Sequence, residues 1–273
     1  MAEFIDIFKI EFMQHALFTG LLVGVMCSFI GVYIVLRRIV FVGASLAQIS
    51  STGFAIGILL EMNPVVSALA QTMLGVIWFA FNLNSKKIPQ DSTLALGYTI
   101  ASASAILILS KHPKGDADLM GLLFGNILTI TSDQIYILLG ALIVLGSIHL
   151  IFYKEFLFVS FDPEMSETLG FRPQVWNVLF YITVGILISL AIKSAGILLV
   201  FGLLVLPPIT AILITEKMSR IFLWSVLIAV ISIPSGLYLS FTQDIPSAPT
   251  IIALMTVWLA GGFAFNKIRY SVA

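Results

Sequence analysis

The chain has 273 residues, of which 59% are hydrophobic and 10% are charged, and its mean hydropathy is +1.08. A soluble domain has about 45 to 50% apolar and about 25% charged residues, so these values exclude a soluble globular protein and predict a polytopic membrane protein. The formal net charge is +0 and there is no basic run, so nucleic acid is not expected as a partner.

Apolar runs close to the ~20 residues that cross a bilayer as a helix recur along the chain. Nine of them are candidate spans: His15 to Leu36, Gly43 to Leu60, Pro64 to Leu83, Leu94 to Leu109, Gln134 to Tyr153, Trp176 to Ile192, Gly196 to Thr215, Ile221 to Phe241 and Ala248 to Phe265. The apolar stretch Leu119 to Ile130 is too short to cross and reads as a re-entrant or interfacial helix. We expect one membrane domain, residues 1–273, with about eight or nine spanning helices.

The second candidate span carries the most polar face. Ser45, Gln48 and Thr52 follow i, i+3, i+7 spacing and therefore share a helix face, and Ser51 lies close by. Such a stripe is typical of a pathway lining. It is equally typical of small polar side chains that hold neighbouring helices together, because both uses require a face turned away from lipid.

A short helix with strong end signals lies between the fifth and sixth spans, in the sequence FDPEMSETLGFR. Asp162 suits the N-cap and Pro163 the first helical position. Glu164 and Glu167 lie near the positive end of the helix dipole, where a carboxylate is favoured. Gly170 can end the helix in a left-handed turn.

The polar helix also has an apolar side. Met165 and Leu169 are four residues apart and share a face that can dock on a partner. The alternative is a solvated loop between two spans, because short capped turns are common there.

The seventh span contains Pro207 and Pro208 in succession. Two missing backbone donors should kink or break the helix and free carbonyls that must find other partners. A structural kink is one interpretation and a moving gate is the other.

Motifs that would let the chain power transport or catalysis by itself are missing. No span core holds Asp or Glu, which proton relays and ion-coupled carriers usually show. There is no GxxxxGK[ST] phosphate loop, no HExxH and no GxSxG. We therefore expect a transport protein that is not an enzyme and that takes its energy from a partner.

Basic residues orient the chain. With nine spans and the polar helix inside, ten Lys and Arg fall on the cytoplasmic side and four, namely Lys9, Lys111, Lys114 and Lys193, fall outside. This bias agrees with the positive-inside rule and predicts a cytoplasmic carboxyl terminus.

Four blocks together resemble the ABC-3 permease family, the membrane subunits of zinc, manganese and iron ABC importers. They are LVGVMCSFIGVYIVLRRIVFVGASLAQISSTGFAIG, DLMGLLFGNIL, FDPEMSETLGF and KSAGILLVFGLLVLPPITAILI, in that order. The resemblance implies an all-α fold that works as a dimer of permeases in the bacterial cytoplasmic membrane, with two cytoplasmic ATPases and an external solute-binding protein. It implies no cofactor on this chain, since the ATPase partner binds ATP and Mg.

The resemblance also gives residues their roles. The segment 155–175, called the coupling segment below, would dock on the ATPase through Asp162, Pro163, Glu164, Glu167 and Gly170. An external loop with His112, Asp116 and Asp118 would receive the substrate.

One departure concerns the substrate. Metal-transporting members commonly place an Asp and a His where this chain has Ala44 and Gln48, and a carboxylate and an imidazole on one helix face suit a borderline cation. Alanine has no donor atom and an amide is a poor ligand, so no metal ligand is assigned on this chain. A cation selected by the binding protein, a non-metal substrate crossing the Ser45 face, a mixed pair with another permease, and a stand-alone channel remain open.

Overall fold

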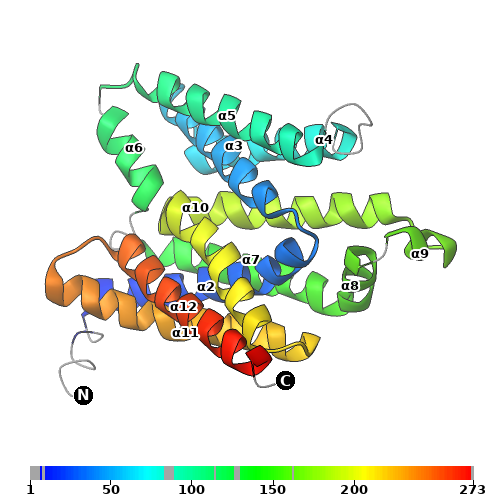
Figure 1. Ribbon diagram of the computed structural model, residues 1–273. Helices are drawn as coiled ribbons and strands as arrows, with labels where there is room; N and C mark the ends of the chain where they lie inside the picture. The colour runs from blue at the N-terminus through cyan, green and yellow to red at the C-terminus, as the bar shows by residue number, and fades with distance from the viewer. Residues whose placement is uncertain are drawn as a thin grey trace. The chain divides into compact units, whose positions relative to one another are not determined.

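The computed structural model describes Ile7 and residues 10–82, 89–113, 115–125, 130–161 and 163–271. Every regular element in these ranges is a helix (Figure 1), so the predicted all-α fold is confirmed. The helices are α2 (Glu11–Leu36), α3 (Val40–Leu59), α4 (Pro64–Asn82), α5 (Gln90–Leu109), α6 (Gly115–Phe124), α7 (Ser132–Ile151), α8 (Tyr153–Phe161), α9 (Pro163–Thr168), α10 (Pro173–Ile214), α11 (Met218–Gln243) and α12 (Ser247–Ser271).

All nine predicted spans fall on helices, and they occupy eight of them because α10 contains two. Seven of the described helices are long and apolar enough to cross a membrane. The apolar part of α4, Pro64–Ala80, is shorter. The first part of the short apolar stretch Leu119 to Ile130 lies in the 10-residue helix α6. Residues 126–129 of the stretch lie outside the described ranges.

Helix α10 runs over 42 residues and is interrupted at Gly196, whose φ of 79° and ψ of 159° are not helical. An L side chain is disfavoured at this φ, so glycine permits the break. The break therefore separates the predicted sixth and seventh spans. Pro207 and Pro208 lie in the second part, where the dihedral angles remain helical, so the predicted break is not at the prolines.

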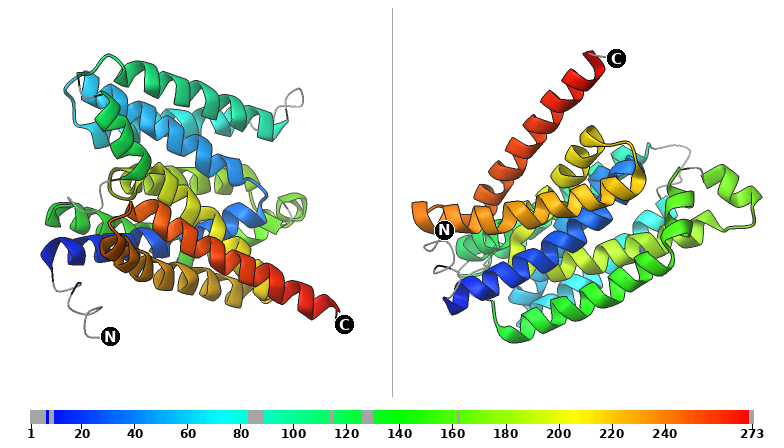
Figure 2. Two further views of the ribbon diagram at one scale, coloured as in Figure 1. Left: turned by 60° about the vertical axis from the view of Figure 1, so that its left-hand side comes forward. Right: turned by 90° about the horizontal axis from the view of Figure 1, so that it is seen from below.

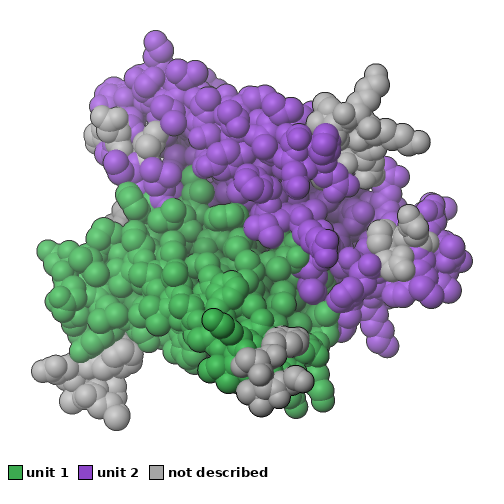
Figure 3. Space-filling view, in the orientation of Figure 1, with its two compact units in different colours: residues 1–35, 124–142, 194–273 green, residues 36–123, 143–193 purple. Residues whose placement is uncertain are grey.

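The chain forms two compact units (Figure 3). Unit 1 contains residues 1–35, 124–142 and 194–273, and unit 2 contains residues 36–123 and 143–193. Helices α7 and α10 each contribute to both units. The expectation of a single membrane domain stays a prediction.

In unit 1, α2 lies alongside α11 (Figure 2). The rings of Phe12 and Phe241 are 6.2 Å apart near one end, and those of Phe29 and Phe222 are 4.9 Å apart near the other. These pairings make the two helices antiparallel. Ser225 adds a 2.8 Å hydrogen bond from its hydroxyl to the Ser28 carbonyl, as expected between helices that lipid would surround.

In unit 2, α3 packs against both α4 and α5 (Figure 1). Helix α3 is largely buried, and its polar residues Ser45, Ser50 and Ser51 are among the buried ones. A polar helix of this kind needs protein partners, because hydrocarbon offers no hydrogen bonds. The first part of α10 also belongs to this unit and meets α4 at Gly185, where an added β-carbon would lie 3.0 Å from Thr72.

Candidate functional site

The coupling segment, residues 155–175, contains most of α8, the whole of α9, the turn after α9 and the first residues of α10. Gly170 has a φ of 88°. The Gly170 amide donates to the Glu167 carbonyl at 3.0 Å, and the Phe171 amide donates to the Ser166 carbonyl at 3.0 Å. These two bonds form a Schellman motif, which satisfies carbonyls that a helix end leaves unbonded. The predicted left-handed helix end at Gly170 is confirmed.

The coupling segment exposes both polar and apolar side chains. Glu167 and Gly170 are exposed, and Met165 and Leu169 are 53% and 60% exposed. Asp162 lies outside the described residues, as do the side chains of Pro163 and Glu164, so the predicted N-cap stays a prediction. Met165 on α9 and Leu169 in the turn directly after α9 therefore lie at the surface, as a docking face requires.

Arg37, directly after α2, fixes the base of the coupling segment. Its Nε donates to Ser160 Oγ at 2.7 Å, and its Nη1 donates to Asn177 Oδ1 at 2.7 Å. The guanidinium carbon lies 4.2 Å from the centroid of the Phe180 ring, a cation–π geometry. One side chain thus ties α8 to the start of α10.

Aromatic rings fill the space beneath this arginine. The His149 ring stacks on Phe156 at 4.7 Å, and Phe156 meets Trp176 edge-on at 5.5 Å. His149 is fully buried, its Nδ1 lies 3.0 Å from the Leu145 carbonyl, and its Nε2 lies 3.4 Å from Thr183 Oγ1. The coupling segment therefore stands on a packed base rather than on a loop.

Sequence analysis missed this base. Arg37 is one of the ten basic residues assigned to the cytoplasmic side, and its partners are more than 100 positions away along the chain. No local pattern links an arginine at a helix end to a distant serine and asparagine. The aromatic content of 153–180 was the available signal.

The polar face of α3 faces α5. Ser45 Oγ donates to the Leu94 carbonyl at 2.6 Å, and Thr52 Oγ1 donates to the Ala101 carbonyl at 2.8 Å. Ser45 and Thr52 therefore hold two helices together. Whether they also line a pathway stays a prediction.

Gln48 differs from its neighbours on the same face. It is 9% exposed, and its amide makes no hydrogen bond to the described residues. Ala44 and Ser51 are also buried, at 8% and 3% exposure. Gln48 and Ser51 thus have side chains that make no hydrogen bond to the described residues, unlike Ser45 and Thr52.

A chain of hydroxyl groups connects α3, α10 and α4 on another side. Ser50 Oγ donates to Ser189 Oγ at 3.1 Å, Ser189 Oγ donates to Thr72 Oγ1 at 2.8 Å, and Thr72 Oγ1 donates to the Ala68 carbonyl at 2.7 Å. All three hydroxyls are buried. No local sequence pattern predicts this chain of hydroxyl groups, because Ser189 and Thr72 are 117 positions apart.

The expected external loop residues are not gathered into a described site. His112 follows α5 and is partly buried, while the side chains of Asp116 and Asp118 on α6 lie outside the described residues. Within the described ranges, no group of three His, Cys, Asp or Glu side chains is placed to hold a metal ion.

The carbonyl that Pro208 leaves without its helical donor is that of Leu204. It lies against α2 at Gly31, where an added β-carbon would overlap it. Helix α2 therefore covers the position that the proline exposes. The role of Pro207 and Pro208 as a gate stays a prediction.

Residues 9–266 match the model of a transport family described as "ABC 3 transport family". The chain belongs to this family. The match begins before the first described span and ends within the last one, so this ABC 3 protein is a multi-pass membrane protein and a transport component.

Two relatives and one solved structure illustrate the kinship. The chain is 28% identical over 255 residues to "Manganese transport system membrane protein MntC" of Listeria monocytogenes, covering 93% of this chain and 91% of that protein. It is 26% identical over 243 residues to "High-affinity zinc uptake system membrane protein ZnuB" of Haemophilus influenzae, covering 89% and 93%.

The structure of "PsaBC from Streptococcus pneumoniae in complex with Fab" superposes with a TM-score of 0.86 at 23% identity, covering 96% of this chain and 95% of that chain. This likeness shows that the ABC 3 protein has the same fold.

Proposed function

We propose that this chain is the membrane-spanning permease subunit of an ATP-binding-cassette importer that takes up a divalent metal, with manganese, zinc and iron as candidates. The observation that carries the proposal is the family match over residues 9–266. The names of MntC and ZnuB refer to manganese and zinc. In this role the chain supplies a path and a conformational switch, and it performs no chemistry on the substrate.

The energy would come from a separate cytoplasmic ATPase that binds ATP and Mg. The exposed pair Met165 and Leu169, held by the Schellman turn at Gly170, supports docking of that ATPase on the coupling segment. Arg37 and the aromatic base would then carry the movement of α8 and α9 into α10. Because close-packed side chains compress little, a displacement of the coupling segment would be transmitted to the membrane spans through this base.

The remaining partners follow from the same role. An external solute-binding protein would deliver the substrate to the face that carries His112, Asp116 and Asp118. A second permease copy would complete the pathway, and the complex would reside in the bacterial cytoplasmic membrane with the carboxyl terminus inside.

A second candidate is the same class of transporter with a substrate other than a metal ion. The observation that favours it is the pair Ala44 and Gln48 on α3, together with the absence of a His, Cys, Asp or Glu group of three in the described ranges. A neutral pathway of amide and hydroxyl groups suits a neutral or chelated substrate better than a bare cation. A channel that works without an ATPase is a further alternative. Failure of the natural chain to copurify with an ATPase would favour it.

Uptake by the reconstituted complex decides between these candidates. Proteoliposomes with permease, ATPase and binding protein are loaded with ATP and Mg, and uptake of manganese, zinc and iron is measured beside vesicles without ATP. The double variant Ala44→Asp with Gln48→His is measured in parallel, with each single variant as its control. ATP-dependent uptake of one metal supports the proposal. If neither the natural chain nor the double variant moves any of the three, the metal assignment is wrong.

A further inference from the structure

A pocket of about 280 Å³ lies in unit 2 between α3, α4 and α5. Helices α4 and α5 both pack along α3, and they lie farther from each other than from α3. The pocket occupies the space that this arrangement leaves. Three of the residues that line it are polar, one from each helix, namely Thr52, Gln71 and Ser104.

The three polar side chains lie close to one level of the helix layer. Thr52 Oγ1 donates to the Ala101 carbonyl at 2.8 Å, and a β-carbon added to Gly53 would lie 2.6 Å from that of Gln71. Ser104 follows Ala101 by one helical turn on the same face of α5. Residues that are distant in the sequence therefore bring an amide and two hydroxyl groups to one pocket.

This level lies inside the membrane. Thr52 comes seven residues before the end of α3 and Gln71 seven residues after the start of α4, a distance of about 10 Å along each helix. The hydrocarbon core of a bilayer is about 30 Å thick, and α3 and α5 are long enough to cross it. Polar groups at this depth need hydrogen bonds from protein or enclosed water, because lipid tails offer none.

Two of the three polar groups lack such bonds to the described residues. The Gln71 amide and the Ser104 hydroxyl are partly buried and make no hydrogen bond there, whereas Thr52 donates to Ala101. The oxygen atoms of all three side chains keep lone pairs that can accept a hydrogen bond or bind a cation. The pocket therefore has unused oxygen ligands at membrane depth.

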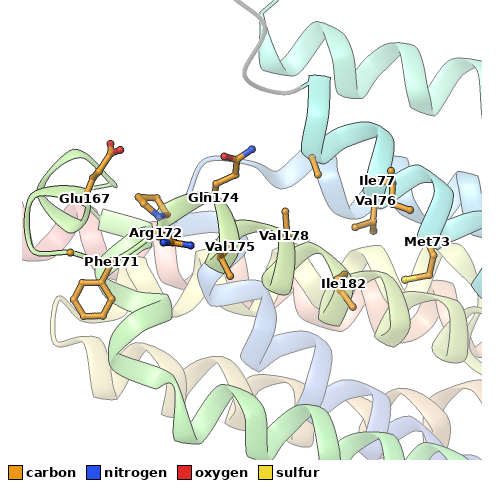
Figure 4. Close-up of a pocket in the computed structure, with 13 residues that line it drawn as sticks. Met73, Val76, Ile77, Glu167, Phe171, Arg172, Gln174, Val175, Val178 and Ile182 are labelled. Carbon is orange, nitrogen blue, oxygen red and sulfur yellow. The ribbon is translucent and has the colours of Figure 1, made fainter.

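The opposite side of α4 borders a cavity of different character (Figure 4). That cavity, of about 900 Å³, lies between α4 and the start of α10, and all of its lining side chains on α4 are apolar. Lipid tails can fill this space along α4 without loss of hydrogen bonds. They would leave Gln71 and Ser104 unsatisfied on the other side of the helix, so the pocket between α3, α4 and α5 favours water.

The pocket is large enough for a hydrated ion. Its volume of about 280 Å³ exceeds the ~180 Å³ that six water molecules occupy in the liquid, at about 30 Å³ each. Six oxygen ligands in octahedral geometry suit hard divalent cations such as manganese. Amide and hydroxyl oxygens can replace some of these waters, and neutral ligands hold the ion weakly enough to release it.

We propose that this pocket is a water-filled part of the translocation pathway, in which Thr52, Gln71 and Ser104 bind a divalent cation that keeps part of its water. The inference rests on the proposed function, because a second permease copy would separate the pocket from lipid. It adds Gln71 and Ser104 to the polar stripe of α3, and Thr52 belongs to both. A chain with Ala44 and Gln48 could then pass a cation without a carboxylate or an imidazole.

Cysteine labelling in membranes that contain the complete transporter tests whether the pocket holds water. A thiol reacts as its thiolate, which forms in water and not in hydrocarbon. The natural chain gives a low background because Cys27, its only cysteine, is fully buried. A membrane-impermeant methanethiosulfonate reagent is supplied on both sides of the membrane. We expect it to label Gln71→Cys and Ser104→Cys roughly tenfold faster than matched controls.

The controls are the neighbouring alanines, Ala70→Cys for Gln71 and Ala103→Cys for Ser104. Both alanines are exposed, lie at almost the same depth as their neighbours and do not line the pocket. Equal labelling rates within each pair would overturn the inference, because the pocket would then be no wetter than the outer faces of α4 and α5.

Uptake by the reconstituted complex tests whether the pocket carries the substrate. Gln71→Leu and Ser104→Ala should each lower ATP-dependent metal uptake several-fold at an unchanged melting temperature, because neither polar group makes a hydrogen bond to the described residues. Thr99→Val is the control, since Thr99 is exposed on α5 and its hydroxyl bonds within the same helix, to the Ala95 carbonyl. Unchanged uptake by both pocket variants would overturn the inference even if the pocket cysteines are labelled.

The two measurements separate this inference from the proposed function. A natural chain that takes up none of the three metals contradicts the proposed function, and the cation in the pocket with it. A complex that takes up metal while its pocket cysteines stay unlabelled overturns this inference alone.

Discussion

The Arg37 guanidinium lies over the ring of Phe180, with 4.2 Å between its central carbon and the ring centroid. The same group donates hydrogen bonds to Ser160 and Asn177. Arginine suits this position because its planar fork can bond two acceptors while its face stacks on a ring. One residue therefore joins the end of α2, the coupling segment and α10.

Replacement of Arg37 should weaken this junction even when the charge is kept. Arg37→Lys loses the fork and the stacking, and we expect the free energy of unfolding to fall by about 2 to 4 kcal/mol. Thermal unfolding in detergent, followed by tryptophan fluorescence, measures the change. The matched control is Arg38→Lys, because Arg38 is the neighbouring arginine and is exposed. Equal melting temperatures of the two variants would contradict the role given to Arg37.

Gly170 should tolerate no other residue without loss of coupling. Its φ of 88° costs an L side chain about 1 to 2 kcal/mol, although a β-carbon there would meet nothing within 4 Å. Gly170→Ala should therefore reduce copurification with the ATPase, and Gly170→Pro should reduce it further because it also removes the amide that bonds to Glu167.

Gly140→Ala is the control for this change, since a β-carbon at Gly140 also meets nothing within 4 Å and the residue is in an ordinary helix. Membrane insertion should be unchanged in all three variants. Undiminished copurification of Gly170→Pro would show that the coupling segment does not bind the ATPase.

The helix end at Gly170 was predictable because capping is local: the signal is a glycine a few residues after a proline start. The separation of the sixth and seventh spans was also predicted next to Gly196, whereas the break expected at Pro207 and Pro208 is not seen in the dihedral angles there. Proline keeps a helical φ, and α2 covers the Leu204 carbonyl that Pro208 cannot bond. The break instead occurs at Gly196, where a positive φ is needed.

Long-range polar contacts set the other limit of sequence-based prediction. The stripe of Ser45, Gln48 and Thr52 was visible as a polar face, but its spacing does not say which hydroxyl bonds to a neighbouring helix. The partners are the carbonyls of Leu94 and Ala101, which every residue carries and no sequence pattern marks. The same holds for Arg37, whose acceptors are distant in the chain.

The hydroxyl chain from Ser50 through Ser189 to Thr72 should behave as one unit. Ser189→Ala removes two bonds and Ser50→Ala removes one of the same two. Each single change should cost roughly 0.6 to 1.7 kcal/mol, and the double change should cost less than the sum. Unfolding of the four proteins of this cycle in denaturant measures the coupling energy. Ser235→Ala is the control, because the Ser235 hydroxyl bonds within its own helix, and a strictly additive cycle would contradict the chain.

The carboxyl terminus should lie in the cytoplasm. The ten-to-four distribution of basic residues places it there, and the exposed ion pair of Arg269 with Glu216 at 3.2 Å adds polar surface to the last turns of α12. A cytoplasm-active reporter fused after Ala273 should be active, and a periplasm-active reporter at the same position should be silent. The reverse pattern would overturn the topology and the cytoplasmic placement of the coupling segment.

Gln48 separates transport from packing on α3. Its amide makes no hydrogen bond to the described residues, so Gln48→Leu should leave the melting temperature nearly unchanged. Ser45→Ala removes the 2.6 Å bond to the Leu94 carbonyl and should lower stability by about 0.5 to 1.5 kcal/mol. If α3 lines the pathway, Gln48→Leu changes the uptake rate or the substrate preference of the reconstituted complex while its fold is intact. If Gln48→Leu takes up the substrate at the same rate and with the same preference as the natural chain, Ser45, Gln48 and Thr52 serve helix packing alone. The pathway would then be lined by other residues.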